Sequence, residues 1–250
     1  MNSSILISYG NFIFRWRDTI FTITILVAFG LLIYGLPGAG DETIGRILSA
    51  AGLAIAALGQ LVRIVTIGLA YIKRGGVGKK ISAETVVRRG LFAHTRNPMY
   101  VGNLLIVTGA IVFIDILYYF PVLLFFYLNY AAIIAAEEHF LKGKFGADYE
   151  DYMQSVNRLI PGNLGRLRES MSEMSFTWKR VIKKEHGSII VLFGSMAVYE
   201  ALKYHFRYGL AWGDERIVLC WIILAVLAVF YLVSEILTRT GRLEWDPNRP

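Results

Sequence analysis

Six apolar runs, each long enough to cross a lipid bilayer as a helix, are the feature of this sequence that most constrains its fold. They cover residues 19–36, 44–72, 98–116, 118–136, 188–204 and 217–237. Over the whole chain 55% of the residues are hydrophobic and 18% are charged, which excludes an ordinary soluble domain. Because backbone groups in lipid must be paired within their own segment, the runs predict an all-α, polytopic bundle of about six transmembrane helices.

Lys and Arg residues are distributed unevenly among the segments that join these runs. Two precede residue 19, seven lie in 73–97, nine lie in 141–187 and three follow residue 237, together 21 of the chain's 26. The segments on the other side contain essentially Arg207 and Arg216. Since Lys and Arg accumulate on the cytoplasmic side, both termini are predicted to be cytoplasmic. We therefore interpret the net charge of +7 as a topology signal and expect no nucleic-acid partner.

The second apolar run has one face made of small residues. They recur at alternating steps of four and three, as Gly45, Ser49, Gly52, Ala56 and Gly59. In lipid, such a stripe lets another helix approach closely. The same face continues to Arg63, which is either a functional intramembrane charge or, as we favour, a side chain that snorkels to the surface.

The third and fourth runs are separated only by a tight turn near Asp115, so they predict an antiparallel helical hairpin. Its two ends return to one membrane face, which brings Arg96-Asn97-Pro98 opposite Glu137-Glu138. Pro98 suits the first turn of a helix, and a helix N-terminus favours anionic groups. The helix N-terminus and Arg96 can hold a carboxylate, and Glu137 or Glu138 opposite can accept from an ammonium group or from hydroxyls. The two ends therefore predict a pocket for a zwitterionic ligand.

The remaining segments are predicted from their polarity and spacing. Residues 1–18 are expected to form an interfacial lead-in, and Ser170–His186 a basic amphipathic helix on the lipid headgroups. Tyr149 and Tyr152 have helical spacing. The single cysteine, Cys220, lies in an apolar run and is expected to be a packing residue.

Two motifs resemble the signatures of a known superfamily, the integral-membrane methyltransferases that include isoprenylcysteine carboxyl methyltransferases and phospholipid N-methyltransferases. The first motif comprises Gly90, Phe92, Arg96, Asn97, Pro98, Tyr100 and Gly102. The second comprises Glu137, Glu138, Leu141, Phe145, Gly146, Tyr149, Tyr152, Val156, Arg158, Ile160 and Pro161. The resemblance divides the chain into a transmembrane methyltransferase core, 1–161, with its motifs at 84–161, and an extension, 162–250, whose two further spans we expect to pack on the core.

The resemblance implies a helix bundle whose cytosolic end binds S-adenosyl-L-methionine. Carried over to this chain, the cofactor-binding positions are Glu84, Thr85, Val86, Val87, Phe92, Arg96, Asn97, Pro98, Met99, Tyr100 and Glu137. Asn97 replaces the histidine of the carboxyl methyltransferases, and Ile133 stands where they have a substrate-binding arginine. These departures favour a phospholipid amine over a prenylcysteine carboxylate as the methyl acceptor.

Three further residues are candidates for the chemistry of transfer. His94, inside the first motif, is the candidate proton acceptor for an amine or thiol substrate. Arg158 is a candidate for meeting a lipid phosphate or an acidic group, and Glu138 is the third catalytic candidate. The four histidines of the chain are scattered without metal-ligand spacing, so no metal is expected.

Other functions fit the same pattern less well. A membrane reductase of the sterol reductase type would bind NADPH at a comparable pocket, and a small-thiol S-methyltransferase would use the same methyl donor. A non-catalytic membrane scaffold that keeps the fold is a further alternative. The sequence predicts membrane lipids and a hydrophobic acceptor as partners but does not indicate an oligomeric state.

Overall fold

The computed structural model describes residues 3–35, 38, 40–70, 81, 83–172 and 174–245. Within these residues the chain forms helices and no strands. Its α-helices are α1 (Ser3–Ile33), α2 (Glu42–Leu69), α3 (Pro98–Ile114), α4 (Pro121–Phe145), α5 (Ala147–Ser155), α6 (Leu167–Ser172), α7 (Trp178–Phe206) and α8 (Glu215–Arg239). Three short 3-10 helices lie between them: η1 (Gly90–Ala93), η2 (Leu117–Tyr119) and η3 (Leu164–Arg166). The predicted all-α class is confirmed.

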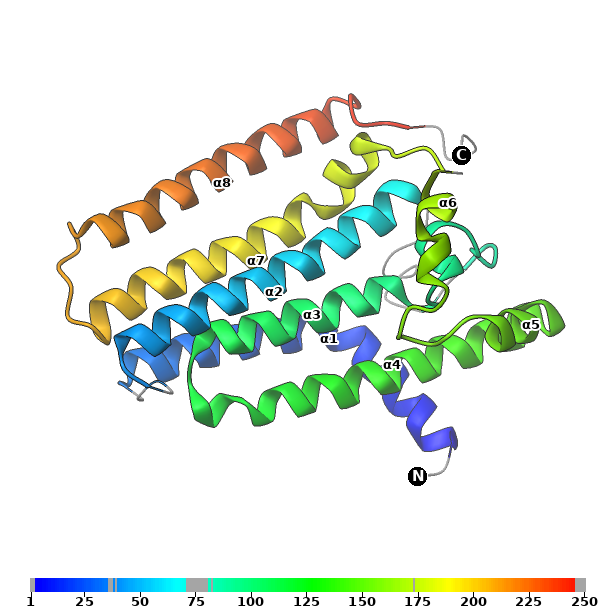
Figure 1. The fold of residues 1–250 in the computed structure, drawn as a ribbon, viewed down its shortest axis with the longest axis horizontal. Helices are drawn as coiled ribbons and strands as arrows, with labels where there is room; N and C mark the ends of the chain where they lie inside the picture. The colour runs from blue at the N-terminus through cyan, green and yellow to red at the C-terminus, as the bar shows by residue number, and fades with distance from the viewer. Residues whose placement is uncertain are drawn as a thin grey trace.

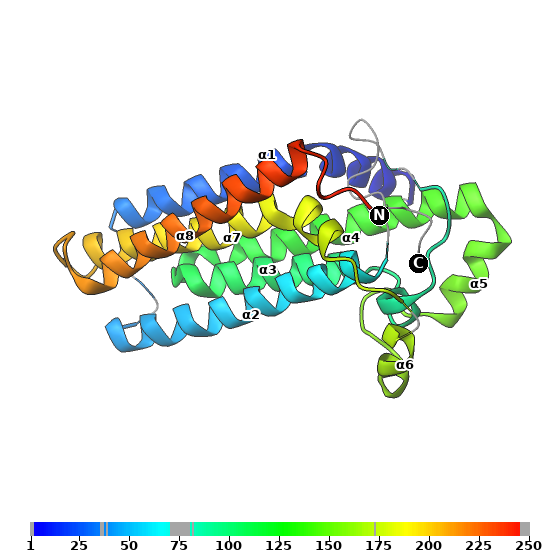
Figure 2. The ribbon, with the colours of Figure 1, turned by 90° about the horizontal axis from the view of Figure 1, so that it is seen from above.

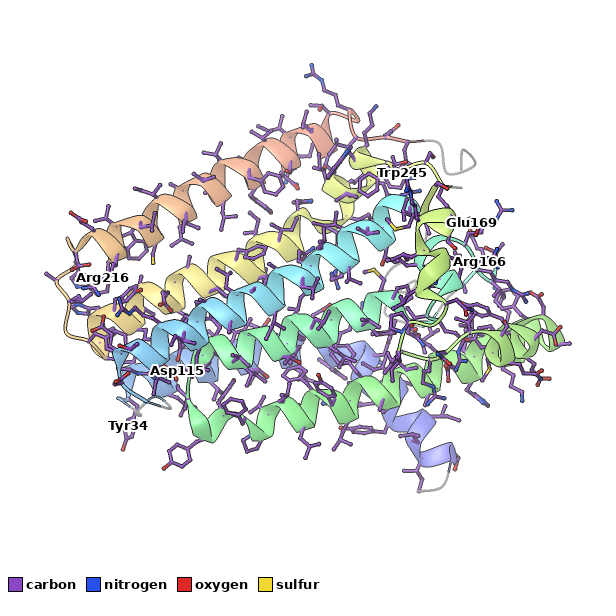
Figure 3. The ribbon with its side chains drawn as sticks, in the orientation of Figure 1. Tyr34, Asp115, Arg166, Glu169, Arg216 and Trp245 are labelled. Atoms are coloured by element: carbon purple, nitrogen blue, oxygen red, sulfur yellow. The ribbon has the colours of Figure 1, made fainter. Side chains whose placement is uncertain are left out.

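The helices α1, α2, α3, α4, α7 and α8 form an elongated bundle with two distinct ends (Figures 1 and 2). Five of them are long and apolar enough to cross a membrane, and α3 is a shorter apolar helix of 17 residues, so the chain is an integral membrane protein. One end carries the α3–α4 turn, and Figure 3 labels Tyr34, Asp115 and Arg216 there. The opposite end carries α5 and α6, and we call it the α5–α6 end.

Helices α2 and α3 pack closely through glycines on both helices. A Cβ atom added to Gly52 would lie 2.5 Å from the carbonyl oxygen of Gly109, and a Cβ added to Gly109 would lie 2.5 Å from that of Gly52. Two turns further along α2, Gly59 and Gly102 meet in the same way. A Cβ added to Gly59 would lie 2.6 Å from the carbonyl oxygen of Gly102, and a Cβ added to Gly102 would lie 2.8 Å from that of Gly59. The predicted small-residue stripe of α2 is therefore a helix–helix contact, and α3 contributes matching glycines.

Helices α1 and α4 cross closely near the α5–α6 end. Gly10 lies against the carbonyl oxygen of Ala132, and a Cβ added there would lie 2.9 Å from Cβ of Ala136. The Tyr9 hydroxyl donates to Oδ1 of Asn129 at 2.6 Å. Residues 3–18 belong to the same continuous helix as the apolar run that follows. Residues 3–18 and the span predicted to start at residue 19 are therefore parts of one helix, and the interfacial position of residues 1–18 stays a prediction.

Arg63 is held inside the bundle, where the expected snorkelling to the surface does not occur. Its side chain is 10% exposed and forms a two-pronged ion pair with Glu185 of α7, at 2.9 to 3.0 Å. Gln60 also donates to Glu185 at 3.0 Å, and Arg63 donates to the side-chain oxygen of Asn103 on α3. The arginine is paired because an isolated charge in the membrane interior is costly. It links α2, α3 and α7.

Helix α7 differs most from the prediction. It starts at Trp178 and continues through Phe206, so Lys183, Lys184 and Glu185 lie in its first turns. The predicted amphipathic helix over Ser170–His186 is wrong, because α6 ends at Ser172 and non-helical backbone precedes Thr177. That backbone is anchored to the end of α2: the Thr177 amide donates to the Gly68 carbonyl at 2.9 Å.

Polar contacts join α7 to the first part of the chain at both of its ends. Arg180 donates to the carbonyls of Ile67 and Gly68 at 2.6 and 2.7 Å, which satisfies the last carbonyls of α2. At the other end, Arg207 pairs with the buried Asp115 at 3.0 Å. Residue Asp115 has a left-handed backbone, with φ of 59°, at the predicted turn after α3. Helix α7 of the extension thus packs on α2 and α3, whereas α8 packs on α7.

The glycine contact between α2 and α3 predicts that Gly109→Ala is destabilising. The added methyl group meets backbone atoms of α2, which cannot move aside as a flexible side chain would, and overpacking of this kind costs about 1–3 kcal/mol. Thermal unfolding in detergent should show a lower midpoint for this variant. Gly187→Ala in α7 is the matched control, because a Cβ there meets nothing within 4 Å. Equal midpoints for both variants would contradict the close packing.

Candidate active site

At the α5–α6 end, the loop before α3 is joined to the loop after α5 by backbone hydrogen bonds. The Arg96 amide donates to the carbonyl of Asn157 at 2.9 Å, and the Gly162 amide donates to the carbonyl of His94 at 2.9 Å. The two loops belong to the two predicted motifs. The structure therefore brings the motifs together through main-chain groups and not only through the helical hairpin.

Side chains of the first motif reinforce this contact. The hydroxyl of Thr95 and the side-chain Nδ2 of Asn97 both donate to the backbone carbonyl oxygen of Arg158, at 3.2 and 3.0 Å. The buried His94 ring bonds the Gly162 carbonyl through Nδ1 at 2.9 Å. Because a carbonyl only accepts, Nδ1 must carry a proton, which leaves Nε2 as the acceptor of a neutral ring. Nε2 is buried and has no partner within the described residues.

Glu138 lies at the centre of a charge cluster that spans α4 and both loops. Its side chain is 6% exposed and pairs with Arg96 at 2.8 Å and with Arg158 through the other oxygen. The Arg96 guanidinium also donates through Nη1 to the carbonyls of Met153 and Val156, at 2.8 and 2.6 Å. All three Arg96 nitrogens are therefore bonded to protein groups. Arg158 is different, because its side chain is 53% exposed.

Glu137, the neighbouring residue, is oriented towards α3. Its Oε1 atom accepts from the hydroxyl of the buried Tyr100 at 2.7 Å. Tyr100 also contacts Tyr130 of α4, with ring centroids 5.7 Å apart. Among the described residues no Lys or Arg forms an ion pair with Glu137. The adjacent glutamates thus have different environments: Glu138 is neutralised by two arginines, whereas Glu137 is bonded to a hydroxyl.

Helix α5 covers the first motif from the outside. Tyr152 is buried and its hydroxyl donates to the carbonyl of Phe92 at 2.7 Å. Burial raises the pKa of both Tyr149 and Tyr152 well above the usual value, so both phenols are neutral and Tyr152 is a dependable donor. The predicted helical spacing of the two tyrosines is confirmed.

The segment that contains Glu84, Thr85, Val86 and Val87 lies on the surface of this end. Glu84 and Thr85 are exposed, and the two valines are half-buried. The segment is attached on both sides: the Lys144 ammonium donates to the carbonyl of Ala83, and Arg88 pairs with Asp148 at 2.6 Å. It therefore runs beside the α4–α5 junction.

The structure groups most of the predicted site residues at one end, in two sets. His94, Arg96, Asn97, Glu138 and Arg158 belong to the joined loops, whereas Tyr100 and Glu137 face each other one turn further into the bundle. Pro98 and Met99 are buried in the first turn of α3. Among the described residues, no group of three His, Cys, Asp or Glu side chains is arranged to hold a metal ion. Sequence reasoning missed the carbonyl acceptors of residues 153–162, which no side-chain pattern indicates.

The charge cluster predicts unequal roles for its two arginines. Arg96→Gln removes a buried guanidinium that is bonded to two carbonyls and a carboxylate, so we expect a loss of about 3 kcal/mol in unfolding free energy. Arg158→Gln removes a half-exposed partner, and we expect a loss below about 1 kcal/mol. Thermal unfolding of both variants in the same detergent measures the difference. Equal destabilisation, or a larger effect at Arg158, would show that Arg96 is not the central link.

Comparison with known families supports the interpretation of this end of the bundle. Residues 47–148 match the family model of the phospholipid methyltransferases, a region that extends from α2 through α3 and α4 into the start of α5. No curated protein and no solved structure matches the chain. The match confirms the resemblance found in the sequence motifs and supports a membrane methyltransferase in general. Over residues 47–148 the chain is thus similar to the phospholipid methyltransferases, a family of integral-membrane methyltransferases.

Proposed function

We propose that this protein transfers a methyl group from S-adenosyl-L-methionine to the amine of a phospholipid at the α5–α6 end of the bundle. The observation that carries the proposal is the Tyr100–Glu137 pair, held between α3 and α4 beside the junction of the two motifs. Both residues lie inside the region that matches the family. A membrane-embedded carboxylate without a cationic partner is a functional group by default.

The groups present at this site fit the proposed cofactor. Glu137 is an acceptor for ribose hydroxyls or for an ammonium group, because only the Tyr100 hydroxyl bonds it within the described chain. In the first turn of α3, Pro98 has no N–H, and the amides of Tyr100 and Val101 donate to the carbonyl of Asn97, so the Met99 amide is the backbone donor that this turn can offer a ligand. The Met99 side chain packs against Ile67 and Val181, away from α4. Arg96, which we expected to hold the cofactor carboxylate, would have to exchange one of its protein partners to do so.

When bound, S-adenosyl-L-methionine supplies an electrophilic methyl group. The protein's contribution is then alignment of the acceptor with that group and exclusion of water. In this chain the joined loops fix the position of α3, and the Glu138 cluster fixes the end of α4. We assign Glu138 and Arg96 to positioning, and Arg158, whose guanidinium is half exposed, to contact with the anionic part of the acceptor.

An amine acceptor must lose a proton before it attacks. His94 is the candidate acceptor of that proton, because its Nδ1–H is fixed on the Gly162 carbonyl and the basic atom Nε2 has no partner in the described structure. The ring is only 3% exposed, so proton transfer to it requires the acceptor or a water molecule to reach a buried atom.

We further infer that the α5–α6 end faces the cytoplasm. The segment around α5, α6 and the start of α7, 141–187, holds nine of the chain's 26 Lys and Arg, more than any other segment between the apolar runs, whereas the opposite end has few. A soluble cofactor would then reach the site from the cytoplasm and a lipid acceptor from the membrane.

Binding of S-adenosylhomocysteine, measured by isothermal titration in detergent, tests the cofactor assignment. We expect Glu137→Ala to weaken binding about tenfold or more, because the variant removes a half-buried carboxylate acceptor. His139→Ala is the matched control, since His139 follows on the same helix and is exposed. NADPH serves as the comparison ligand. Unchanged affinity for S-adenosylhomocysteine in Glu137→Ala would refute the pocket assignment, and binding of NADPH in its place would indicate a reductase.

A further inference from the structure

The segment 158–168, which leads from α5 into α6, exposes apolar and basic side chains together. Ile160 is 78% exposed and Leu164 is 61% exposed. The segment has no Asp or Glu, and its charged residues are Arg158, Arg166 and Arg168. We call it the arginine loop. Apolar and basic side chains close together are typical of segments that lie on lipid headgroups.

Hydrogen bonds hold the arginine loop at the level where α3 begins. The Gly162 amide donates to the carbonyl of His94 at 2.9 Å, and the Arg158 carbonyl accepts from Nδ2 of Asn97 at 3.0 Å. The apolar helix α3 starts at the next residue, Pro98. The loop therefore lies beside the first turn of a helix that is buried in the membrane, not far out in solvent.

Two aromatic rings mark the edge of the membrane at the same end of the bundle. Phe176 packs over the end of α2, where a Cβ atom added to Gly68 would clash with its ring. Trp178, the first residue of α7, is 64% exposed, and the two rings lie 4.7 Å apart. Exposed tryptophans are enriched at the membrane–water interface. In Figure 2, α6 projects from the side of the bundle at this end, so it is placed to run along the membrane surface.

The outer arginines of the loop can accept an anionic ligand. Arg166 pairs with Glu169 at 3.0 Å (Figure 3), but their side chains are 74% and 56% exposed. An exposed pair of this kind contributes little free energy, so a phosphate can replace the carboxylate. Arg168 is also exposed and forms no ion pair among the described residues.

We propose that the arginine loop lies in the headgroup layer of the membrane and binds anionic phospholipids there. Ile160 and Leu164 insert below the headgroups, and Arg166 and Arg168 bind the phosphates. The interaction requires no methyl transfer, so it is independent of the proposed function. It agrees with the role assigned to Arg158, whose half-exposed side chain lies at the inner end of the loop and would meet lipid phosphates at the edge of the site.

A fluorescent probe on the loop tests its position in the membrane. The single cysteine is removed by Cys220→Ala, so that Leu164→Cys can be labelled with bimane in the full-length protein in phosphatidylcholine nanodiscs. The control probe is at Gln154→Cys, on the exposed surface of α5. We expect spin-labelled lipid to quench the loop probe more than the control, and aqueous iodide to quench it less. The reverse order would show that the loop lies in water and would overturn the proposal.

Two spin-labelled lipids at equal mole fractions test the preference for anionic headgroups. We expect phosphatidylglycerol to quench the loop probe at least about twofold more than phosphatidylcholine, because the arginines attract its charge. The difference should shrink in high salt and disappear in Arg166→Gln/Arg168→Gln. The control, Arg239→Gln/Arg242→Gln, removes two exposed arginines at the end of α8 and should keep it. Equal quenching by the two lipids, or a difference that Arg166→Gln/Arg168→Gln retains, would refute binding of anionic lipid by the loop.

Discussion

The buried carboxylate of Glu138 is the interaction on which the geometry of the candidate site depends. It belongs to α4, yet its two partners, Arg96 and Arg158, lie in the loops before α3 and after α5. Arg96 extends the connection to two backbone carbonyls at the end of α5 and in the loop that follows. Burying such a pair costs desolvation free energy. Removing one partner destabilises the protein more, because an unpartnered buried charge remains. Three separate segments are therefore held in one arrangement by one side chain.

Buried polar groups also determine how the bundle is put together. In lipid, helices gain little from apolar contact alone, so close backbone approach and polar pairing decide which helices meet. Glycines bring α2 against α3, and the Arg63–Glu185 pair attaches α7 to both of them. The Asp115–Arg207 pair does the same at the far end. Helix α7 thus completes the environment of α2 and α3.

The sequence predicted what local pattern determines. Apolar runs predicted the helices, and the small-residue stripe predicted the α2 face that meets α3 at Gly52, Ala56 and Gly59. The hairpin placed Arg96 and Glu137 at one end. It did not predict contacts whose partners are distant or carry no side-chain signal. Glu185 pairs with Arg63 across 122 residues, and the acceptors of the joined loops are backbone carbonyls. The basic residues before Glu185 led to the prediction of a surface helix over Ser170–His186. Their spacing shows that charges lie on a helix but not whether each one faces the lipid headgroups or the interior of the bundle.

Transfer of a methyl label tests the central claim, which is that this end of the bundle methylates a phospholipid amine. Membranes that contain the protein are incubated with methyl-labelled S-adenosyl-L-methionine and separated into lipid, protein and volatile fractions. We expect label in N-methylated phospholipid, and only background in membranes that contain Glu137→Ala. Label recovered as base-labile methyl esters on protein, or as a volatile thioether, would contradict the assignment of a phospholipid amine as the methyl acceptor. Label at background in every fraction would contradict the proposed methyltransferase activity.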